Sequence, residues 1–322
     1  MILSVSRRTD IPNYYADWFC NRIKEGFVYV KNPMNPHQVS RVGLSPALVD
    51  CIVFWTKNPE PMMARLHELN GYAYYFQFTL TGYGRDIEPN VPHKKNKMIP
   101  VFQRLSETIG SSRVVWRYDP ILFNNTYTEE YHLRAFEQIA DALAGYTKRF
   151  VISFVDTYAK NRTAMRELKV KEPFGEDGQE DCEQIQLQLQ NLKVFAAQLS
   201  EIAHRNGMEI ATCAEKIDLS DCGIAHSSCI DKVLVEEITG YAIDVGKDKH
   251  QRAECGCVES VEVGTYHTCL NGCKYCYATH SWEKVKKNFK EYDPESPLLC
   301  GRIEDGDKIT MRKVKKNEKS MD

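Results

Sequence analysis

The stretch Ser260–Phe289 reads SVEVGTYHTCLNGCKYCYATHSWEKVKKNF. Its first residues alternate between polar and apolar side chains, which predicts a β-strand. A loop with three cysteines follows, at Cys269, Cys273 and Cys276, and a helix is predicted from about Ser281. The order is therefore strand, cysteine loop, helix.

The three cysteines have the spacing C-x3-C-x2-C, and an aromatic residue, Tyr275, precedes the third. Cysteine thiolates are ligands of zinc and of iron–sulfur clusters. A cluster of four irons that is held by only three cysteines leaves one iron without a protein ligand, so a substrate or cofactor can bind there. This arrangement is typical of an enzyme and not of a purely structural metal site.

Upstream of this stretch, strand-like and helix-like segments alternate along the chain. The helices are amphipathic, and several end at a glycine, as at Gly26, Gly110 and Gly145. Six such units, followed by one more strand near Val261, predict a single α/β barrel, TIM-like and closed or nearly closed. The predicted strands cover residues 2–5, 51–55, 72–80, 114–116, 150–155 and 209–212.

The cysteine spacing and the aromatic residue at Tyr275 resemble the cluster loop of radical S-adenosylmethionine (SAM) enzymes. In those enzymes the loop normally follows the first strand, whereas here it lies in the last sixth of the chain. Because a barrel is a ring, the strand near Val261 can pair with Ile2–Val5, as in a circular permutation. Four further segments resemble an uncharacterised bacterial family with a radical-SAM-like cysteine cluster at its C-terminus: residues 6–12, 54–59, 116–120 and 255–257.

The resemblance covers residues 1 to about 301 and implies a [4Fe-4S] cluster on Cys269, Cys273 and Cys276, with SAM on the free iron and Tyr275 against SAM. It implies reductive cleavage of SAM to start radical chemistry on an unknown, small-molecule substrate. It also implies an electron donor such as flavodoxin or ferredoxin. The competing class is a non-catalytic barrel that zinc or an iron–sulfur cluster stabilises and that binds a ligand or partner.

Charged residues follow the apolar cores of several predicted strands. A single such residue is more often a helix cap or a surface ion pair, but the carboxyl ends of parallel strands meet at one mouth of a barrel. Four of these residues are basic, which favours an anionic ligand. The candidates for binding SAM or substrate are Arg7, Arg8, Lys57, Arg117, Asp119, Asp156 and Glu215.

A second group of cysteines lies between the sixth predicted strand and the cysteine loop. Four thiolates without an open position suit a structural zinc or an auxiliary iron–sulfur cluster, whereas inert packing of free thiols is the alternative. The preferred set is Cys213, Cys229, Cys255 and Cys257. A zinc ribbon that leaves Cys269 unused is another interpretation, with ligands Cys255, Cys257, Cys273 and Cys276.

The other cysteines are expected to be structural or ordinary loop residues: Cys20, Cys51, Cys182, Cys222 and Cys300. His267 and His280 flank the cysteine loop and are expected to be solvated, although a histidine there can also serve as a ligand or proton donor.

Composition sets the remaining expectations. The chain has 322 residues, 43% of them apolar, and its 42 basic and 44 acidic residues give a net charge of −2, which provides no evidence of nucleic-acid binding. No apolar run approaches the ~20 residues needed to span a membrane. A cytoplasmic location is expected, where twelve cysteines favour metal ligation over disulfides. The expected divisions are barrel units in 1–254, a cysteine-rich segment completing the barrel in 255–300, and a tail in 301–322 with a solvated basic run from Arg312 to Lys319.

Overall fold

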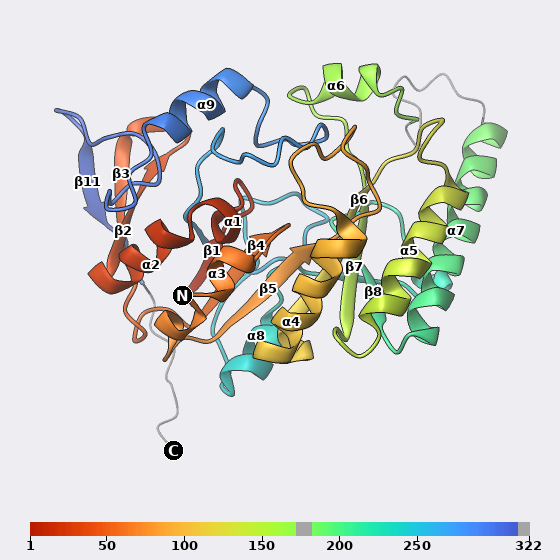
Figure 1. Ribbon diagram of the computed structural model, residues 1–322, viewed down its shortest axis with the longest axis horizontal. Coiled ribbons are helices and arrows are strands. Elements are labelled where there is room, and N and C mark those ends of the chain that lie inside the picture. Colours follow the sequence, from red (N-terminus) through yellow and green to blue (C-terminus); the bar gives the residue numbers. More distant parts are fainter. Residues whose placement is uncertain (172–181, 315–322) are drawn as a thin grey trace.

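The computed structural model of the chain describes residues 1–171 and 182–314, and side chains of residues 182–185 are not described. Among the described residues, eight parallel strands form the main sheet in the order β10-β1-β4-β5-β6-β7-β8-β9 (Figure 1). The order from β1 to β9 follows the order along the chain. The strands are β1 (Ile2–Val5), β4 (Cys51–Thr56), β5 (Tyr74–Thr79), β6 (Val114–Ile121), β7 (Arg149–Phe154), β8 (Glu209–Cys213), β9 (Ala225–Ser227) and β10 (Val261–Glu262).

Most helices cover one face of this sheet, as Figure 1 shows for α4 and α5. Connections between parallel strands are right-handed, so a sheet whose strands follow chain order places its connecting helices on one side. Alternate strand residues such as Phe76 and Phe78 pack with these helices in the largest apolar core. The helices are α1 (Ile11–Tyr14), α2 (Ala16–Glu25), α3 (Glu60–Met63), α4 (Ile99–Ile109), α5 (Glu129–Leu143), α6 (Arg162–Glu167), α7 (Cys182–Arg205), α8 (Lys232–Thr239) and α9 (Trp282–Lys290). Short 3-10 or π turns occur at Leu66–Leu69, Lys94–Met98, Ser111–Arg113 and Ser220–Cys222.

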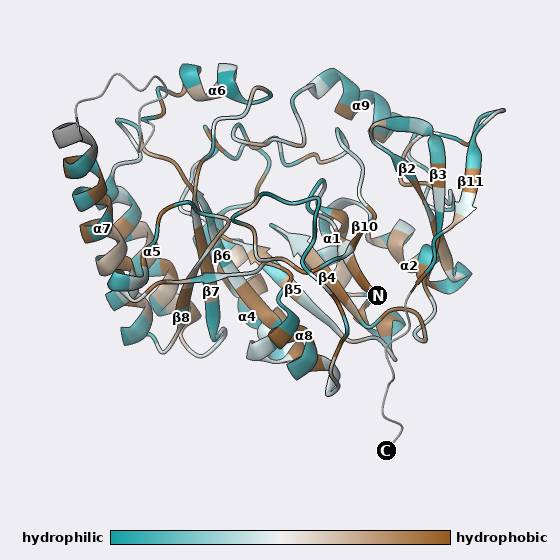
Figure 2. Cartoon of the chain, turned by 180° about the vertical axis from the view of Figure 1, so that it is seen from behind, coloured by the Kyte–Doolittle hydropathy of each residue, from teal (hydrophilic) through white to brown (hydrophobic). Residues whose placement is uncertain are grey.

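The other face, which we call the inner face, carries a separate apolar cluster. Strand residues that alternate with the first set, among them Val53 and Tyr75, pack there with Leu234 and Val235 of α8. Figure 2 gives the view from behind, with α8 below the strands. Side chains on a strand point alternately to the two faces, so the two clusters are separated by the sheet itself.

The expected barrel is wrong, because the sheet is open and ends at β9 and β10. Strands β1 and β10 do pair in parallel, with Leu3 opposite Val261, as expected. After β9, however, the chain crosses the inner face and does not add further strands that would close a ring. The carbonyl oxygen of Cys229 accepts hydrogen bonds from Tyr75 Oη (2.8 Å) and Gln77 Nε2 (2.7 Å) of β5. The crossing segment therefore fills the space that a closed barrel would enclose.

A second sheet of three strands lies beside α2 and α9 in Figure 1. It consists of β2 (Phe27–Asn32), β3 (Asn35–Gly43) and β11 (Lys308–Met311). Strands β2 and β3 form an antiparallel hairpin, and β11 pairs in parallel with β3. The segment after residue 300 thus contributes a strand, while most of the basic run Arg312–Lys319 lies outside the described residues.

In the described part of the chain, no helix combines the length and the apolar character that crossing a membrane requires.

Candidate metal centres

The three-cysteine loop lies between β10 and α9. Because β10 is next to β1, the loop starts at the carboxyl end of the sheet, where loops of parallel α/β proteins build their sites. Burial raises the pKa of all three thiols, that of Cys273 to about 12. The charges of Asp10, Cys276 and Cys273 raise the pKa of Cys269 further, and Glu88 and Cys276 do the same for Cys273. Each thiol of the loop is therefore harder to ionise than a free cysteine.

Polar side chains from distant segments hold this loop in place. Asn271 donates to the buried Asp10 carboxylate (3.0 Å) and accepts from Tyr14 Oη (2.9 Å). From the segment after β5, Asn90 Nδ2 donates to the carbonyl oxygen of Leu270 (2.7 Å). Asp10 also caps α1, so one buried carboxylate ties the loop to the first helix. The loop thus has a defined conformation that its own few residues could not maintain.

A buried carboxylate, Glu88, lies at the side of the loop between two lysines. Lys57 Nζ is 2.8 Å from Glu88 Oε1, Lys94 forms a second ion pair with it, and Tyr275 Oη donates to the same carboxylate. Burial opposes ionisation of Glu88, but the two lysines lower its pKa to about 2. One carboxylate and two ammonium groups give this group a net positive charge. Lys57 lowers the pKa of the adjacent Cys273, which opposes the larger effect of burial.

The two predicted arginines after β1 lie between the loop and the inner face. The Arg7 guanidinium is 5.3 Å from the Trp55 ring centroid, and its Nη2 is buried without a hydrogen-bond partner among the described residues. The Arg7 carbonyl oxygen accepts from Tyr277 Oη (3.0 Å), beside the third cysteine. Arg8 lies 4.7 Å from the Tyr266 ring centroid. Arg7 is thus a partly buried cation, next to the cysteine loop, whose buried Nη2 is an unused donor within the described part of the chain.

The four cysteines of the second group come together on the inner face. The sulfur atoms of Cys213 and Cys229 are 2.6 Å apart. Hydrogen bonding with Cys213, Cys229 and Cys255 lowers the pKa of Cys257. All four residues are buried. Because Cys255 and Cys257 join this group, the structure does not support the alternative zinc ribbon that pairs them with Cys273 and Cys276.

Arg117 and Asp119 belong to the second group and not to the cysteine loop. Arg117 Nη1 is 2.9 Å from Cys229 Sγ and 3.3 Å from Gln77 Oε1, and the guanidinium forms an ion pair with Asp119. Its carbon Cζ lies 5.3 Å from the Trp55 ring centroid, the same distance as that of Arg7. Trp55 therefore contacts both arginines.

Asp156 and Glu215 follow β7 and β8. Asp156 is exposed and pairs with Arg252, whereas Glu215 accepts from the Phe154 amide at 2.8 Å. Burial raises the pKa of Glu215 to about 7. Asn161 bridges from the Asp156 carbonyl (3.2 Å) to that of Tyr275 (3.1 Å), so the segment after β7 contacts the cysteine loop.

Several residues of these centres were not predicted from the sequence: Trp55, Gln77, Glu88, Lys94, Asn161 and Glu262. Glu262 had a visible signal, since it is a charged residue between two valines of a strand; its carboxylate accepts from Ser4 Oγ (3.0 Å) and the Arg7 amide (2.9 Å). Glu88 and Lys94 lie in segments without periodic patterning.

The cysteines expected to be structural lie apart from both groups. Cys20 and Cys51 are buried, Cys300 is partly buried, and Cys222 donates to the Lys193 carbonyl oxygen. The side chain of Cys182 lies outside the described residues. His267 and His280 stack edge to face, with ring centroids 4.2 Å apart.

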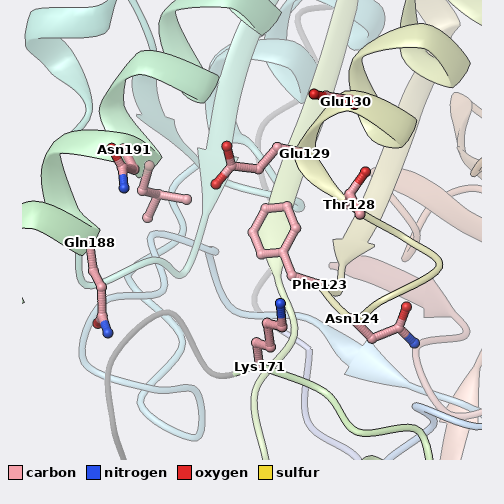
Figure 3. A pocket seen from close by; sticks show the side chains of 9 residues that line it. Phe123, Asn124, Thr128, Glu129, Glu130, Lys171, Gln188 and Asn191 are labelled. Carbon is pink, nitrogen blue, oxygen red and sulfur yellow. The ribbon is translucent and has the colours of Figure 1, made fainter.

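Two clefts are relevant to ligand access. One of about 490 Å³ lies between α5 and α7 and includes Phe123, Glu129 and Lys171 (Figure 3), but none of the cysteines or predicted rim residues lines it. Another, of about 880 Å³, is lined by Cys273 and Cys276 together with residues of α6 and the start of α9. A small molecule can therefore approach the cysteine loop from this side.

A surface group, His37, Glu304 and Asp307, places three potential ligand atoms within 4.8 Å of one another, a criterion that no set of cysteines meets among the described residues. These side chains are exposed or form ion pairs, with Asp307 bound to Lys31 and His37. We assign no function to it.

The fold and the cysteines define an open-sheet α/β protein whose many cysteines are compatible with metal binding. A family model described as "Domain of unknown function (DUF1848)" matches residues 2–278. The chain belongs to this family, and the match extends through both cysteine groups. This confirms the expected membership of an uncharacterised family. No curated protein and no solved structure matches the chain.

Proposed function

We propose that the protein is a radical SAM enzyme in which Cys269, Cys273 and Cys276 hold a [4Fe-4S] cluster. When bound, such a cluster supplies the electron that cleaves SAM reductively and starts radical chemistry on the substrate. The observation that carries the proposal is the set of three cysteines on one short loop that Asn271 and Asn90 hold in place beside a ligand-sized cleft. Three protein ligands leave one iron free for SAM.

The charges around the loop fit an anionic cluster. The Lys57, Lys94 and Glu88 group carries one more positive than negative charge, and Lys57 acts on Cys273. This surplus positive charge opposes the effect of burial, which favours the neutral thiol. Glu88 also accepts a hydrogen bond from the Tyr275 hydroxyl. The charged group therefore both holds the loop in position and sets the charge around it.

Among the predicted rim residues, Arg7 is our candidate for the carboxylate of SAM. Its buried Nη2 has no hydrogen-bond partner in the described part of the chain, and an unpaired buried donor costs about 1–3 kcal/mol, more if charged, unless a ligand satisfies it. Glu215, with a pKa of about 7, is a candidate for proton exchange with a substrate near neutral pH. An external donor such as flavodoxin or ferredoxin would supply the electron.

Anaerobic reconstitution with iron and sulfide, followed by incubation with SAM and dithionite, tests the proposal. We expect 5′-deoxyadenosine from the wild type and none from Cys273→Ala. Cys300→Ala is the matched control, because this partly buried cysteine lies outside both groups, and it should form product normally. If Cys273→Ala forms product at the wild-type rate, or if the reconstituted wild type binds only zinc and cleaves no SAM, the non-catalytic metalloprotein is the correct class.

A further inference from the structure

The second cysteine group, separate from the loop proposed to bind the cluster, has the composition of a closed metal site. Its members come from three segments: the end of β8, the chain after β9, and the C-x-C pair before β10. The Cys213 and Cys229 sulfur atoms are 2.6 Å apart, and all four cysteines are buried in the same apolar cluster. The four thiols therefore belong to one buried region of the inner face.

The surroundings of this volume are arranged for negative charge. Arg117 Nη1 lies 2.9 Å from Cys229 Sγ, and the Ile230 amide donates to Cys257 Sγ (3.3 Å). Arg7 is a second, partly buried cation that packs on the same Trp55 ring as Arg117, and the charges of Cys257, Cys229 and Glu262 raise its pKa against the effect of burial. Thiolates in this group would add negative charge beside two cations, which is favourable in the protein interior.

We propose that Cys213, Cys229, Cys255 and Cys257 bind one zinc ion in a tetrahedral, four-thiolate site. The 2.6 Å contact between the Cys213 and Cys229 sulfur atoms suits a single ion with Zn–S distances of about 2.3 Å better than a [4Fe-4S] cluster, which must fit irons and sulfides between its ligands. Four thiolates on a divalent cation carry two negative charges, which Arg7 and Arg117 offset in part, since Arg117 is also paired with Asp119. Binding displaces the thiol protons.

The ion holds the segment that crosses the inner face. The Cys229 carbonyl oxygen already accepts from Tyr75 and Gln77 at the middle of the sheet, so fixing the sulfur of Cys229 fixes this segment over β5. The C-x-C pair then ties the crossing segment to β10, from which the cysteine loop starts. With no open coordination position, the site is structural.

The experiment uses the full chain with Cys269, Cys273 and Cys276 all changed to Ala, so that its result does not depend on the proposed cluster. We expect one zinc and no acid-labile sulfide per chain. Adding Cys229→Ser should abolish zinc binding, whereas adding Cys51→Ala should not, since Cys51 lies in the same apolar cluster but outside the four. Replacement of zinc by Co²⁺ should give the absorption bands of a tetrahedral tetrathiolate site.

A folded triple variant without metal would overturn the inference, as would labile sulfide, which indicates a cluster. In case the variants do not fold, zinc release is also measured on the wild type: titration of its thiols with a mercurial should free one zinc per chain, detected with a chromogenic chelator. Release of no zinc from folded wild type would also overturn it. A wild-type protein that contains zinc but cleaves no SAM after reconstitution would refute only the proposed function.

Discussion

The two cysteine groups differ in how the chain brings their sulfur atoms together. Cys269, Cys273 and Cys276 lie on one short loop, partly exposed and beside a cleft, and side chains from elsewhere hold that loop. The second group gathers four buried sulfurs from three distant segments, with sulfurs in direct contact. Three cysteines on one loop can leave a coordination position of a bound metal open. Four cysteines from separate segments fill every position of a tetrahedral ion, so a bound ion would hold those segments together.

The largest expected effect separates the two groups by stability. Cys257→Ser should remove the ion and lower Tm by roughly 6 °C or more, taking a loss of at least ~3 kcal/mol and ~2 °C per kcal/mol for a chain of this length. Cys276→Ser should change Tm by less than ~2 °C, because its loop contributes little to either apolar core. Thermal unfolding monitored by circular dichroism measures both. An equal fall in Tm for the two variants would show that the two cysteine groups do not differ in their contribution to stability.

Replacing Glu88 tests how the loop is held. Glu88→Gln should cost ~3–5 kcal/mol, because it leaves two buried lysines without their partner. The pKa of Glu88 is lowered from 4.5 to about 2, so its stabilisation is complete above pH 4.5 and is lost as the pH falls towards 2. Urea unfolding between pH 7 and 3 should show a flatter pH dependence for the variant. The variant should retain less iron but the same amount of zinc. An unchanged dependence of the unfolding free energy on pH would show that the Glu88 carboxylate is not stabilised by the two lysines.

Gly264 lies where β10 passes β1 and the cysteine loop begins. A Cβ atom there would lie 1.8 Å from Ser6 Oγ and 2.5 Å from Ser6 Cβ. Gly264→Ala should therefore displace the start of the loop and cost about 1–3 kcal/mol. Gly246→Ala is the matched control, since nothing lies within 4 Å of its Cβ position. Chemical denaturation and iron content check the prediction, which fails if the two alanine variants behave alike.

The smallest expected effect concerns Glu215. Its pKa is raised from 4.5 to about 7, so the folded state binds the proton more tightly and loses stability as pH rises from 4.5 through 7. Glu215→Gln should remove this loss and stabilise the protein at pH 8 by on the order of 1 kcal/mol, after discounting for partial solvation. Neither metal should be affected. Lower stability of the variant at pH 8 would show that the carboxylate is ionised and favourably paired.

The strands of the main sheet could be predicted because their apolar runs and helix-ending glycines are local signals. The shape of the sheet could not, because closure depends on what fills the inner face, and the crossing segment around Cys229 has no periodic pattern. The hairpin of β2 and β3 and the pairing of β11 were missed for a related reason. Their partner choice is set by contacts between distant residues.

The candidate sites divide in the same way. Both sets of cysteines could be named from their spacing and position in the sequence, because the thiolate is a recognisable metal ligand. Metal binding stays a prediction for each set. Arg117 and Asp119 were expected to follow a strand over 114–116 and to bind SAM or substrate, but both lie within β6, which runs to Ile121, and Arg117 contacts the other cysteine group. Which of two neighbouring centres a long side chain reaches depends on rotamers and packing that a sequence does not display.

The pairing of β10 with β1 has a consequence for synthesis of the protein. Ser4 and Glu262 are hydrogen-bonded although 258 residues separate them. While the ribosome is making the chain, β1 has no partner on that side until Val261 and Glu262 have left the exit tunnel. The cysteine loop emerges later still. A chain released before that point would carry a nearly complete main sheet but would lack both β10 and the three-cysteine loop.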